Sequence, residues 1–513
     1  MADVVYRANL KAAQFPFLTE LEGQTIIVKG PDQTAPLGDF AKSTTDISGQ
    51  GIPQIYYCHN VMPTDNGYIS TSYNEVVVQA YPPATNFEET VVLRDSTGAS
   101  AILAIDESGN LYVMQAGTTI WVIPAGAPAA ATIAGKRMTV AFVSGITYIY
   151  FENVACYVYT FTTNTLAIQA LAGLTAADIL GIVAVRGYMI AYTGQSVFWS
   201  STILATDFVP DLTTGSGGGQ LEGARGIIIT IEAVYGGMIV FTTGNAIAAT
   251  SSDNVRFPFN FLEITGSGGL IDASFVSLDA NSSSVYAYTT AGMQKVSLKS
   301  AEVVFPEVTD FLSGDLFEDF DESTNILSLT HTNGIVIPKK LVVIASRYLV
   351  ISYGITSLTH AIVYDLVYKQ WGKLKVDHVD CYEWNRATTE VPKNNVAFLN
   401  SGGSVKVLNS DIQNDDANGV MILGKFQYVR SRFMQLQRVA FENVNQGATF
   451  NLYDLPSLDG KNFQSAIVGY LQVNTGKFRE YLFHNTALNH TILAKGGFNA
   501  VSMVLTFTVS GAR

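Results

Sequence analysis

The side chains that carry most protein chemistry are few in this chain and lie far apart. Six histidines and three cysteines occur among 513 residues, and none falls in an HExxH, a CxxC or a catalytic Cys-His spacing. No GxSxG nucleophile motif is present either. The residues concerned are His59, His331, His360, His378, His484, His490, Cys58, Cys156 and Cys381. We predict that the cysteines are buried thiols of a protein folded in a reducing cytosol, and not disulfides or zinc ligands.

Three short segments imitate ligand-binding loops. GSGGGQ (215–220) has the glycines of a phosphate loop, but no GK[ST] follows it, so we interpret it as a flexible connection. DLFEDFDESTN (315–325) is acidic, yet its glycine and final glutamate are not placed as in a calcium loop. SLDGKNF (457–463) resembles the Asp-box turn of sialidases faintly and is better explained as a turn. We therefore predict no catalytic, cofactor-binding or metal-binding residue, although two acids far apart in sequence can still meet as a glycosidase pair.

Composition limits the partners of the chain. Hydrophobic residues make up 48% and charged residues 14%, which suits a large folded core. The net charge of −13 repels DNA phosphates, so tight sequence-specific DNA binding is not expected. The N-terminus lacks the apolar region of a secretory signal. The most apolar segment, LVVIASRYLVISYG (341–354), is interrupted by Arg347 and alternates like strands, so we predict no membrane-spanning segment.

The elements that must position any site are β-hairpins. After residue 90 an apolar run, a Gly or Asn turn and a second apolar run recur, with turns near residues 109, 153, 194, 244, 292, 368 and 402. A period of roughly 40 to 50 residues in an all-β chain indicates four-stranded blades, so we predict a β-propeller of about seven blades, with six to eight allowed. The alternative is a β-sandwich or an irregular β-domain.

The pattern also divides the chain into parts. We predict an N-terminal segment (1–85) that packs on the other domains, a β-propeller (86–417) and a C-terminal sandwich-like β platform domain (418–513). The wide gap before the turn at 368 holds an acidic insertion (305–325) with a short helix from Val308 to Leu312. In the hairpin AIVYDLVYKQWGKL (361–374), Tyr364 and Trp371 are expected to wedge between neighbouring blades.

Several segments together resemble the tail nozzle proteins of short-tailed bacteriophages, also called packaged-DNA stabilisation proteins. They are NVMPTDNGYIS (60–70), SVFWSSTILATDFVPD (196–211), AIVYDLVYKQW (361–371) and LPSLDGKNF (455–463). They resemble that family in order and spacing as well as in residue types. The matching positions are Asn60, Pro63, Gly67, Tyr68, Trp199, Asp207, Phe208, Pro210, Asp459 and Gly460.

This resemblance implies a virion structural protein without enzyme activity or cofactor. Members of the family form a six-fold ring below the portal and adaptor, extend the DNA channel and contact tail fibre or needle proteins. The resemblance thus implies a hexamer in the virion tail, assembled in the host cytoplasm, through which double-stranded DNA passes non-specifically. The acidic insertion would then face the lumen, or else form a solvated outer loop. The rival hypotheses are a carbohydrate-binding or glycan-hydrolysing propeller, such as a receptor-binding tail component, and a bacterial propeller scaffold of no viral origin.

Overall fold

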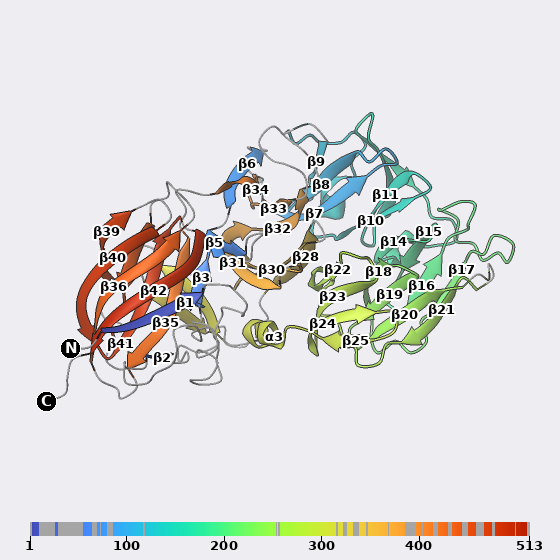
Figure 1. Cartoon of the computed structure of the whole chain (residues 1–513). Helices are drawn as coiled ribbons and strands as arrows, with labels where there is room; N and C mark the ends of the chain where they lie inside the picture. The colour runs from blue at the N-terminus through green and yellow to red at the C-terminus, as the bar shows by residue number, and fades with distance from the viewer. Residues whose placement is uncertain are drawn as a thin grey trace.

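The computed structural model is built almost entirely of β-strands (Figure 1). It describes residues 3–9, 26–28, 55–63, 69–71, 73–79, 86–313, 316–321, 326–331, 338–413 and 419–509, less the short gaps 116–117, 119, 253, 255–256, 345–346, 368, 385–394, 403, 429–432, 444–449, 458–465, 475–477 and 498. No helix of this described part is long and apolar enough to cross a membrane.

Seven antiparallel sheets of the described chain form the blades of a propeller. Blade 1 contains β7 (Phe87–Arg94), β8 (Ser100–Asp106) and β9 (Leu111–Gln115), and blade 2 contains β10 (Met138–Val143), β11 (Ile146–Phe151), β12 (Ala155–Thr160) and β13 (Thr165–Gln169). Blade 3 contains β14 (Gly181–Val185), β15 (Tyr188–Tyr192), β16 (Ser196–Trp199) and β17 (Gly217–Gln220). Blade 4 contains β18 (Ile228–Val234), β19 (Gly237–Thr242), β20 (Ala246–Ser251) and β21 (Phe259–Glu263). Blade 5 contains β22 (Val276–Leu278), β23 (Ser284–Thr289), β24 (Gly292–Ser297) and β25 (Ala301–Val303). Blade 6 contains β28 (Lys339–Ile344), β29 (Tyr348–Tyr353), β30 (Leu358–Asp365) and β31 (Gln370–His378). Blade 7 contains β32 (Asp380–Trp384), β33 (Asn395–Leu399), β34 (Val405–Gln413) and, as its outermost strand, β6 (Tyr73–Gln79).

The first strand of each blade is the innermost, and these seven strands close a ring around one axis (Figure 1). In order, β7 contacts β10, β10 contacts β14, β14 contacts β18, β18 contacts β22, β22 contacts β28, β28 contacts β32, and β32 returns to β7. The predicted all-β class and the predicted propeller of about seven blades are confirmed. The alternative of a sandwich or irregular β-domain for this part of the chain is wrong.

The predicted turns fall one in each blade. In six blades the turn joins the second and third strands, as it does between β19 and β20. In blade 6 the turn near residue 368 instead joins the third and fourth strands, β30 and β31, which widens the gap before it. Gly217–Gln220 was interpreted as a flexible connection, and that was wrong: it is β17, the outermost strand of blade 3.

The insertion between blades 5 and 6 contains the predicted helix. Helix α3 (Pro306–Ser313) is followed by a hairpin of β26 (Leu316–Asp321) and β27 (Ile326–His331). Val308, Phe311 and Leu312 of α3 are buried in one core cluster with side chains of blades 4, 5 and 6. The helix therefore seals the junction of blades 5 and 6, while the acidic side chains at 315–325 lie outside the described residues.

Beyond the propeller, two sheets form a β-sandwich at the other end of the molecule (Figure 1). One contains β1 (Asp3–Asn9), β42 (Asn499–Val509), β36 (Met434–Asn443), β40 (Phe478–Ala487) and β39 (Tyr470–Asn474). The other contains β2 (Ile26–Val28), β3 (Ile55–His59), β35 (Val420–Tyr428), β41 (Asn489–Gly496), β37 (Phe450–Asp454) and β38 (Ile467–Val468). Strands from residues 1–85 thus complete both sheets.

The propeller and the sandwich share one continuous sheet. The outer strand of blade 6, β31, pairs with β4 (Val61–Pro63), β4 pairs with β5 (Ile69–Thr71), and β5 pairs with β42 of the sandwich. The resulting path of strands runs from β28 to β39. Main-chain hydrogen bonds of the N-terminal segment therefore join the two domains.

Candidate functional site: the polar ring around the propeller axis

Side chains on the innermost strands join neighbouring blades by accepting amide hydrogen bonds. Glu89 Oε2 in blade 1 accepts the N–H of Met138 in blade 2 at 3.0 Å. Thr139 Oγ1 in blade 2 accepts the N–H of Ile182 in blade 3 at 2.9 Å. Ser277 Oγ makes the same kind of contact with the Val343 N–H, at 2.9 Å, between blades 5 and 6. These bonds satisfy polar groups at blade junctions where no ladder of main-chain bonds can form.

Asp380 closes the ring between blades 6, 7 and 1. Its Oδ2 accepts the main-chain N–H of Thr90 at 2.8 Å and the Thr90 hydroxyl, and its Oδ1 forms an ion pair with Lys340. Oδ1 also accepts the Cys381 N–H at 2.6 Å. Only 1% of Asp380 is exposed, so both carboxylate oxygens are committed to these structural contacts.

Arg137 extends across the ring from the residue before β10. Its Nη2 donates to the Tyr192 hydroxyl of blade 3 at 2.6 Å, and its Nη1 donates to the Ile229 carbonyl of blade 4 at 3.1 Å. A guanidinium can hold such divergent acceptors because its N–H groups form a rigid planar fork. Arg137 therefore connects three blades on its own.

Two glutamates beside Arg137 have strongly shifted pKa values. Burial raises the pKa of Glu89 to about 7, against the opposing effects of the Met138 N–H and of Lys340. Burial also raises the pKa of Glu232, on β18, to about 7, with Arg137 opposing the shift. Burial disfavours the charged form of Lys340, but Asp380 outweighs this and raises its pKa. We call Glu89, Arg137, Glu232, Lys340 and Asp380 the axis network.

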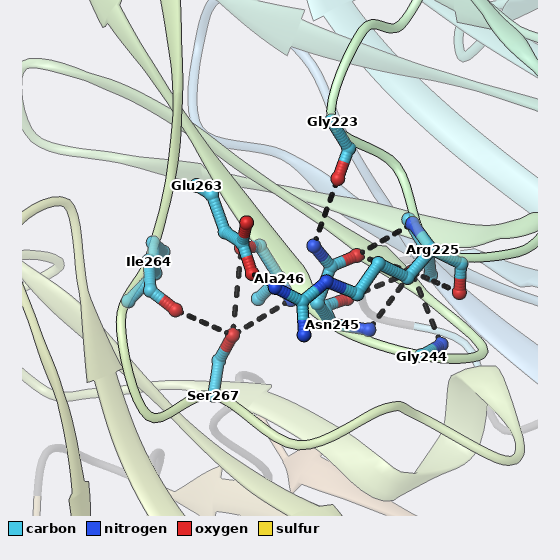
Figure 2. Close-up of polar contacts among 9 residues, drawn as sticks. Gly223, Arg225, Gly244, Asn245, Ala246, Glu263, Ile264 and Ser267 are labelled. Carbon is cyan, nitrogen blue, oxygen red and sulfur yellow. Dashed lines mark hydrogen bonds and ion pairs between the residues drawn. The ribbon is translucent and has the colours of Figure 1, made fainter.

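The end of the propeller at which the innermost strands begin is also held by contacts at the blade turns. Figure 2 shows one such corner in blade 4, where the Asn245 side chain donates to the Gly223 carbonyl at 3.0 Å and accepts the Arg225 N–H at 3.0 Å. Arg225 pairs with Glu263 at 2.8 Å on the outer strand. Asn245 is buried and its turn is tight, because a Cβ at Gly244 would lie 2.0 Å from the Arg225 carbonyl oxygen. This corner fixes the connection from blade 3 to blade 4.

The histidines and cysteines that sequence reasoning singled out do not gather into a site. The buried histidines are His59, His360, His378 and His490, while His484 is exposed and the side chain of His331 lies outside the described residues. Burial lowers the pKa of His378 to about 4, so it is neutral at physiological pH. His490 Nδ1 contacts Asp454 Oδ2 at 2.7 Å inside the sandwich.

All three cysteines are free and buried, as predicted. Burial raises the pKa of Cys156 to about 12, which leaves its thiol unreactive. Within the described residues, no group of three or more His, Cys, Asp or Glu side chains is arranged to hold a metal ion.

The residues that carry the family resemblance have structural contacts where they are described. Trp199 Nε1 donates to the Gly215 carbonyl at 2.8 Å, Phe208 is buried between blades 2 and 3, and the Asn60 side chain accepts the Lys375 N–H at 2.9 Å. Asp207 caps the N–H of Val209 at 3.1 Å, and Pro210 is exposed. Pro63 ends β4, and the positions Gly67, Tyr68, Asp459 and Gly460 lie outside the described residues.

The axis network was not predicted from the sequence. Its members are charged residues in or directly before apolar strands, Glu89 in FEETVVLR and Glu232 in IITIEAV among them, and they are separated by up to 291 positions, from Glu89 to Asp380. A charged residue at a position that alternation assigns to a strand interior is the signal that could have marked them. Two of its members, Glu89 and Glu232, have pKa values raised by burial to about 7 and so can exchange protons near neutral pH.

Exposed apolar side chains mark a second feature, at the edge of the sandwich. Strands β38 and β39 end their respective sheets among the described strands, and Ile467, Val468, Tyr470 and Leu471 are all exposed there, Tyr470 by 74%. Neighbouring residues of a strand point to opposite faces, so both faces of this edge are apolar. Open apolar edges are normally covered in a working assembly.

No family model matches the sequence, and no curated protein matches it. Among solved structures, the chain is similar to YCF48 from Cyanidioschyzon merolae, with 11% identity and a TM-score of 0.40 over 66% of this chain and 99% of that one. A structure of YCF48 bound to D1 peptide gives 10% identity and a TM-score of 0.38, covering 68% of this chain and 98% of that one. The structure of BamB from Moraxella catarrhalis has 10% identity and a TM-score of 0.35, covering 66% of this chain and 97% of that one. Similarity at this level carries no information on function.

Proposed function

We propose that the protein is a virion structural protein, a non-enzymatic tail nozzle ring that extends the DNA channel of a short-tailed bacteriophage, retains packaged DNA and takes part in its ejection. The ring is a hexamer in the virion tail, assembled in the host cytoplasm, and it binds the adaptor ring and fibre or needle proteins. The sequence resemblance at 60–70, 196–211, 361–371 and 455–463 motivates this proposal.

One structural observation supports the proposal most: the sheet that continues from blade 6 through β4 and β5 into the sandwich. A nozzle must keep its shape while DNA passes under pressure, and domains that share main-chain hydrogen bonds cannot hinge freely about a linker. The apolar edge at β38 and β39 adds support, because a ring needs a surface that neighbouring copies cover.

The axis network bears on the route of the DNA. Arg137, Lys340 and Asp380 meet around the axis of the propeller and are engaged in contacts between blades. The DNA path in this proposal is therefore the lumen at the centre of the ring of copies, and not the axis of an individual propeller.

Electron microscopy of the purified full-length protein and of the particle tests the proposal. We expect closed rings with six-fold symmetry and a lumen wide enough for duplex DNA. A chain that stays monomeric at high concentration and is monomeric in particles would overturn it.

A carbohydrate-binding propeller is the second candidate, and one observation favours it. Trp199 is half-buried on the outer part of blade 3, with the rings of Phe259 and Phe261 at 6.0 and 6.4 Å. The neighbouring strand β17 begins with three glycines, and Gly217 lies beside the indole with no side chain, since a Cβ there would be 3.4 Å from the Trp199 ring. Aromatic side chains present a flat apolar body suited to stacking. Glycan-array binding that Trp199→Ala abolishes, in a chain that remains monomeric, would favour this function over the nozzle.

A further inference from the structure

The junction between blades 1 and 2 is bridged by the carboxyl group of Glu89, whose pKa is raised by burial to about 7. Glu89 Oε2 is the acceptor for the first amide of β10, that of Met138. The side chain next to that amide is Arg137, which reaches onward to blades 3 and 4. Glu232, on β18 of blade 4, interacts electrostatically with the same guanidinium, which opposes the rise in its pKa. The junctions of blades 1, 2 and 4 therefore share one cluster of charges.

We propose that Glu89, Arg137 and Glu232, on or beside three innermost strands, form a proton-dependent latch around the propeller axis, a latch that is closed while the glutamates hold protons and opens more readily once they ionise. An opened junction would hydrate the carboxylates, and hydration favours their charged form. Proton release therefore shifts the balance toward the open junction.

The surrounding charged and titratable groups determine the pH range over which Glu89 and Glu232 ionise. Glu89 faces Lys340 of blade 6, Asp380 of blade 7 and Arg137. Arg137 in turn faces Tyr192 of blade 3, Glu152 in the turn of blade 2 and Asp272 before blade 5, in addition to the two glutamates. Lys340 is already paired with Asp380, and Arg137 is shared among several acids, so neither cation neutralises Glu89 and Glu232 completely. The burial of both glutamates then holds their titration near pH 7.

The blade 2–blade 3 junction supplies a matched control within the same chain. There Thr139 takes the place of Glu89 and accepts the Ile182 N–H through a hydroxyl that does not ionise. Loss of this hydrogen bond should therefore lower the protection of the Ile182 amide by the same factor at every pH. The two junctions differ in the acceptor and share the geometry of one side-chain oxygen and one amide.

Hydrogen exchange of the full-length protein, resolved to the amides of Met138 and Ile182 and corrected for intrinsic rates, tests the latch between pH 5.5 and 8. We expect protection at Met138 to fall by roughly tenfold or more as pH rises, and protection at Ile182 to stay constant. In Glu89→Gln, an uncharged mimic of the protonated side chain, Met138 should stay protected at pH 8. Thr139→Val should lower protection at Ile182 by the same factor at both pH values.

Three outcomes would overturn the proposal: constant protection at Met138 in the unaltered chain, an equal fall at Ile182, or the same fall in Glu89→Gln as in the unaltered chain. If Glu89→Gln does not fold, Glu232→Gln is the substitute. It retains the Met138 hydrogen bond and should reduce the fall in protection, and an undiminished fall there would likewise overturn the latch.

Discussion

Trp371 and Tyr364 lie directly opposite each other on β31 and β30, with their ring centroids 4.4 Å apart. Phe305, in the segment that leaves blade 5, packs against both rings at 5.1 and 4.6 Å. Only 5% of Trp371 is exposed, and it belongs to a core cluster shared by blades 4, 5 and 6. The expectation that this aromatic pair wedges between blades is confirmed.

Replacement of Trp371 by alanine should therefore lower the free energy of unfolding by about 3 to 5 kcal/mol, because the sheets on either side cannot collapse into the cavity. Urea denaturation followed by fluorescence and circular dichroism measures this. Val367→Ala, in the exposed turn of the same hairpin, should change it by less than about 0.5 kcal/mol. A Trp371→Ala effect as small as the Val367 effect would contradict the assignment.

Asp380→Asn should cost about 3 to 5 kcal/mol of stability, because it leaves the half-buried Lys340 ammonium without its counter-ion and weakens the bonds to Thr90. Glu263→Gln is the comparison, since it breaks the exposed ion pair with Arg225 and should cost less than about 1 kcal/mol. Thermal and urea unfolding of the two variants should separate them clearly. Equal losses would mean that the buried contacts of Asp380 stabilise the ring junction no more than an exposed ion pair does.

The axis network also predicts how stability varies with pH. The folded-state pKa of Glu89 and Glu232 lies near 7, above the ordinary 4.5, so the folded chain binds more protons than the unfolded chain between these values. Their contribution to the free energy of unfolding therefore falls as pH rises from about 4.5 to 7 and levels off above. The double variant Glu89→Gln/Glu232→Gln should gain stability relative to the unaltered chain at pH 8 and little at pH 5. Glu88→Gln, exposed on the same strand as Glu89, should leave the pH profile unchanged.

If the proposed ring exists, a charge placed on the apolar edge of the sandwich should prevent its assembly. Tyr470→Glu should shift the mass distribution from hexamer to monomer without changing the unfolding transition, since Tyr470 is exposed in the isolated chain. Mass photometry of the full-length protein measures the shift. Tyr235→Glu, exposed by 84% in a turn of blade 4, is the control and should leave the hexamer intact. Rings that persist in Tyr470→Glu would place the interface elsewhere.

The net charge of −13 predicts that duplex DNA is not held tightly. Fluorescence anisotropy with a short duplex at moderate salt should give a Kd weaker than about 1 µM, and binding should weaken further with added salt. Tighter binding would conflict with a conduit along which DNA slides.

Much of the fold followed from the sequence because hairpin turns are local. Gly109, Gly244 and Gly292 each mark the middle hairpin of a blade, and their alternating neighbours identify the strands. The N-terminal strands could not be assigned in this way. β6 pairs with β34, more than 300 residues later, and β4 pairs with β31, contacts that depend on the closed ring and not on any local pattern.

The axis network could not be predicted for a related reason. Glu89, Arg137 and Glu232 come from three blades, and only the order of the blades around the axis brings them together. Read singly, each is one polar residue in or beside a strand. The three glycines of β17 gave a misleading local signal. A glycine run is typical of loops and so predicted a flexible connection, but here it forms an outermost strand.

The pairing of β6 with β34 has a consequence for biosynthesis. Residues 73–79 leave the ribosome before any blade exists, and their partner, residues 405–413, is made only after all seven innermost strands. Six blades are thus translated before β6 can pair with its partner strand in the seventh. Because this pairing joins residues far apart in the chain, closing the ring of blades should be a slow step of folding. A chain that terminates early lacks β34 and leaves β6 without its partner strand, so an incomplete product carries an open strand edge with which other chains can pair.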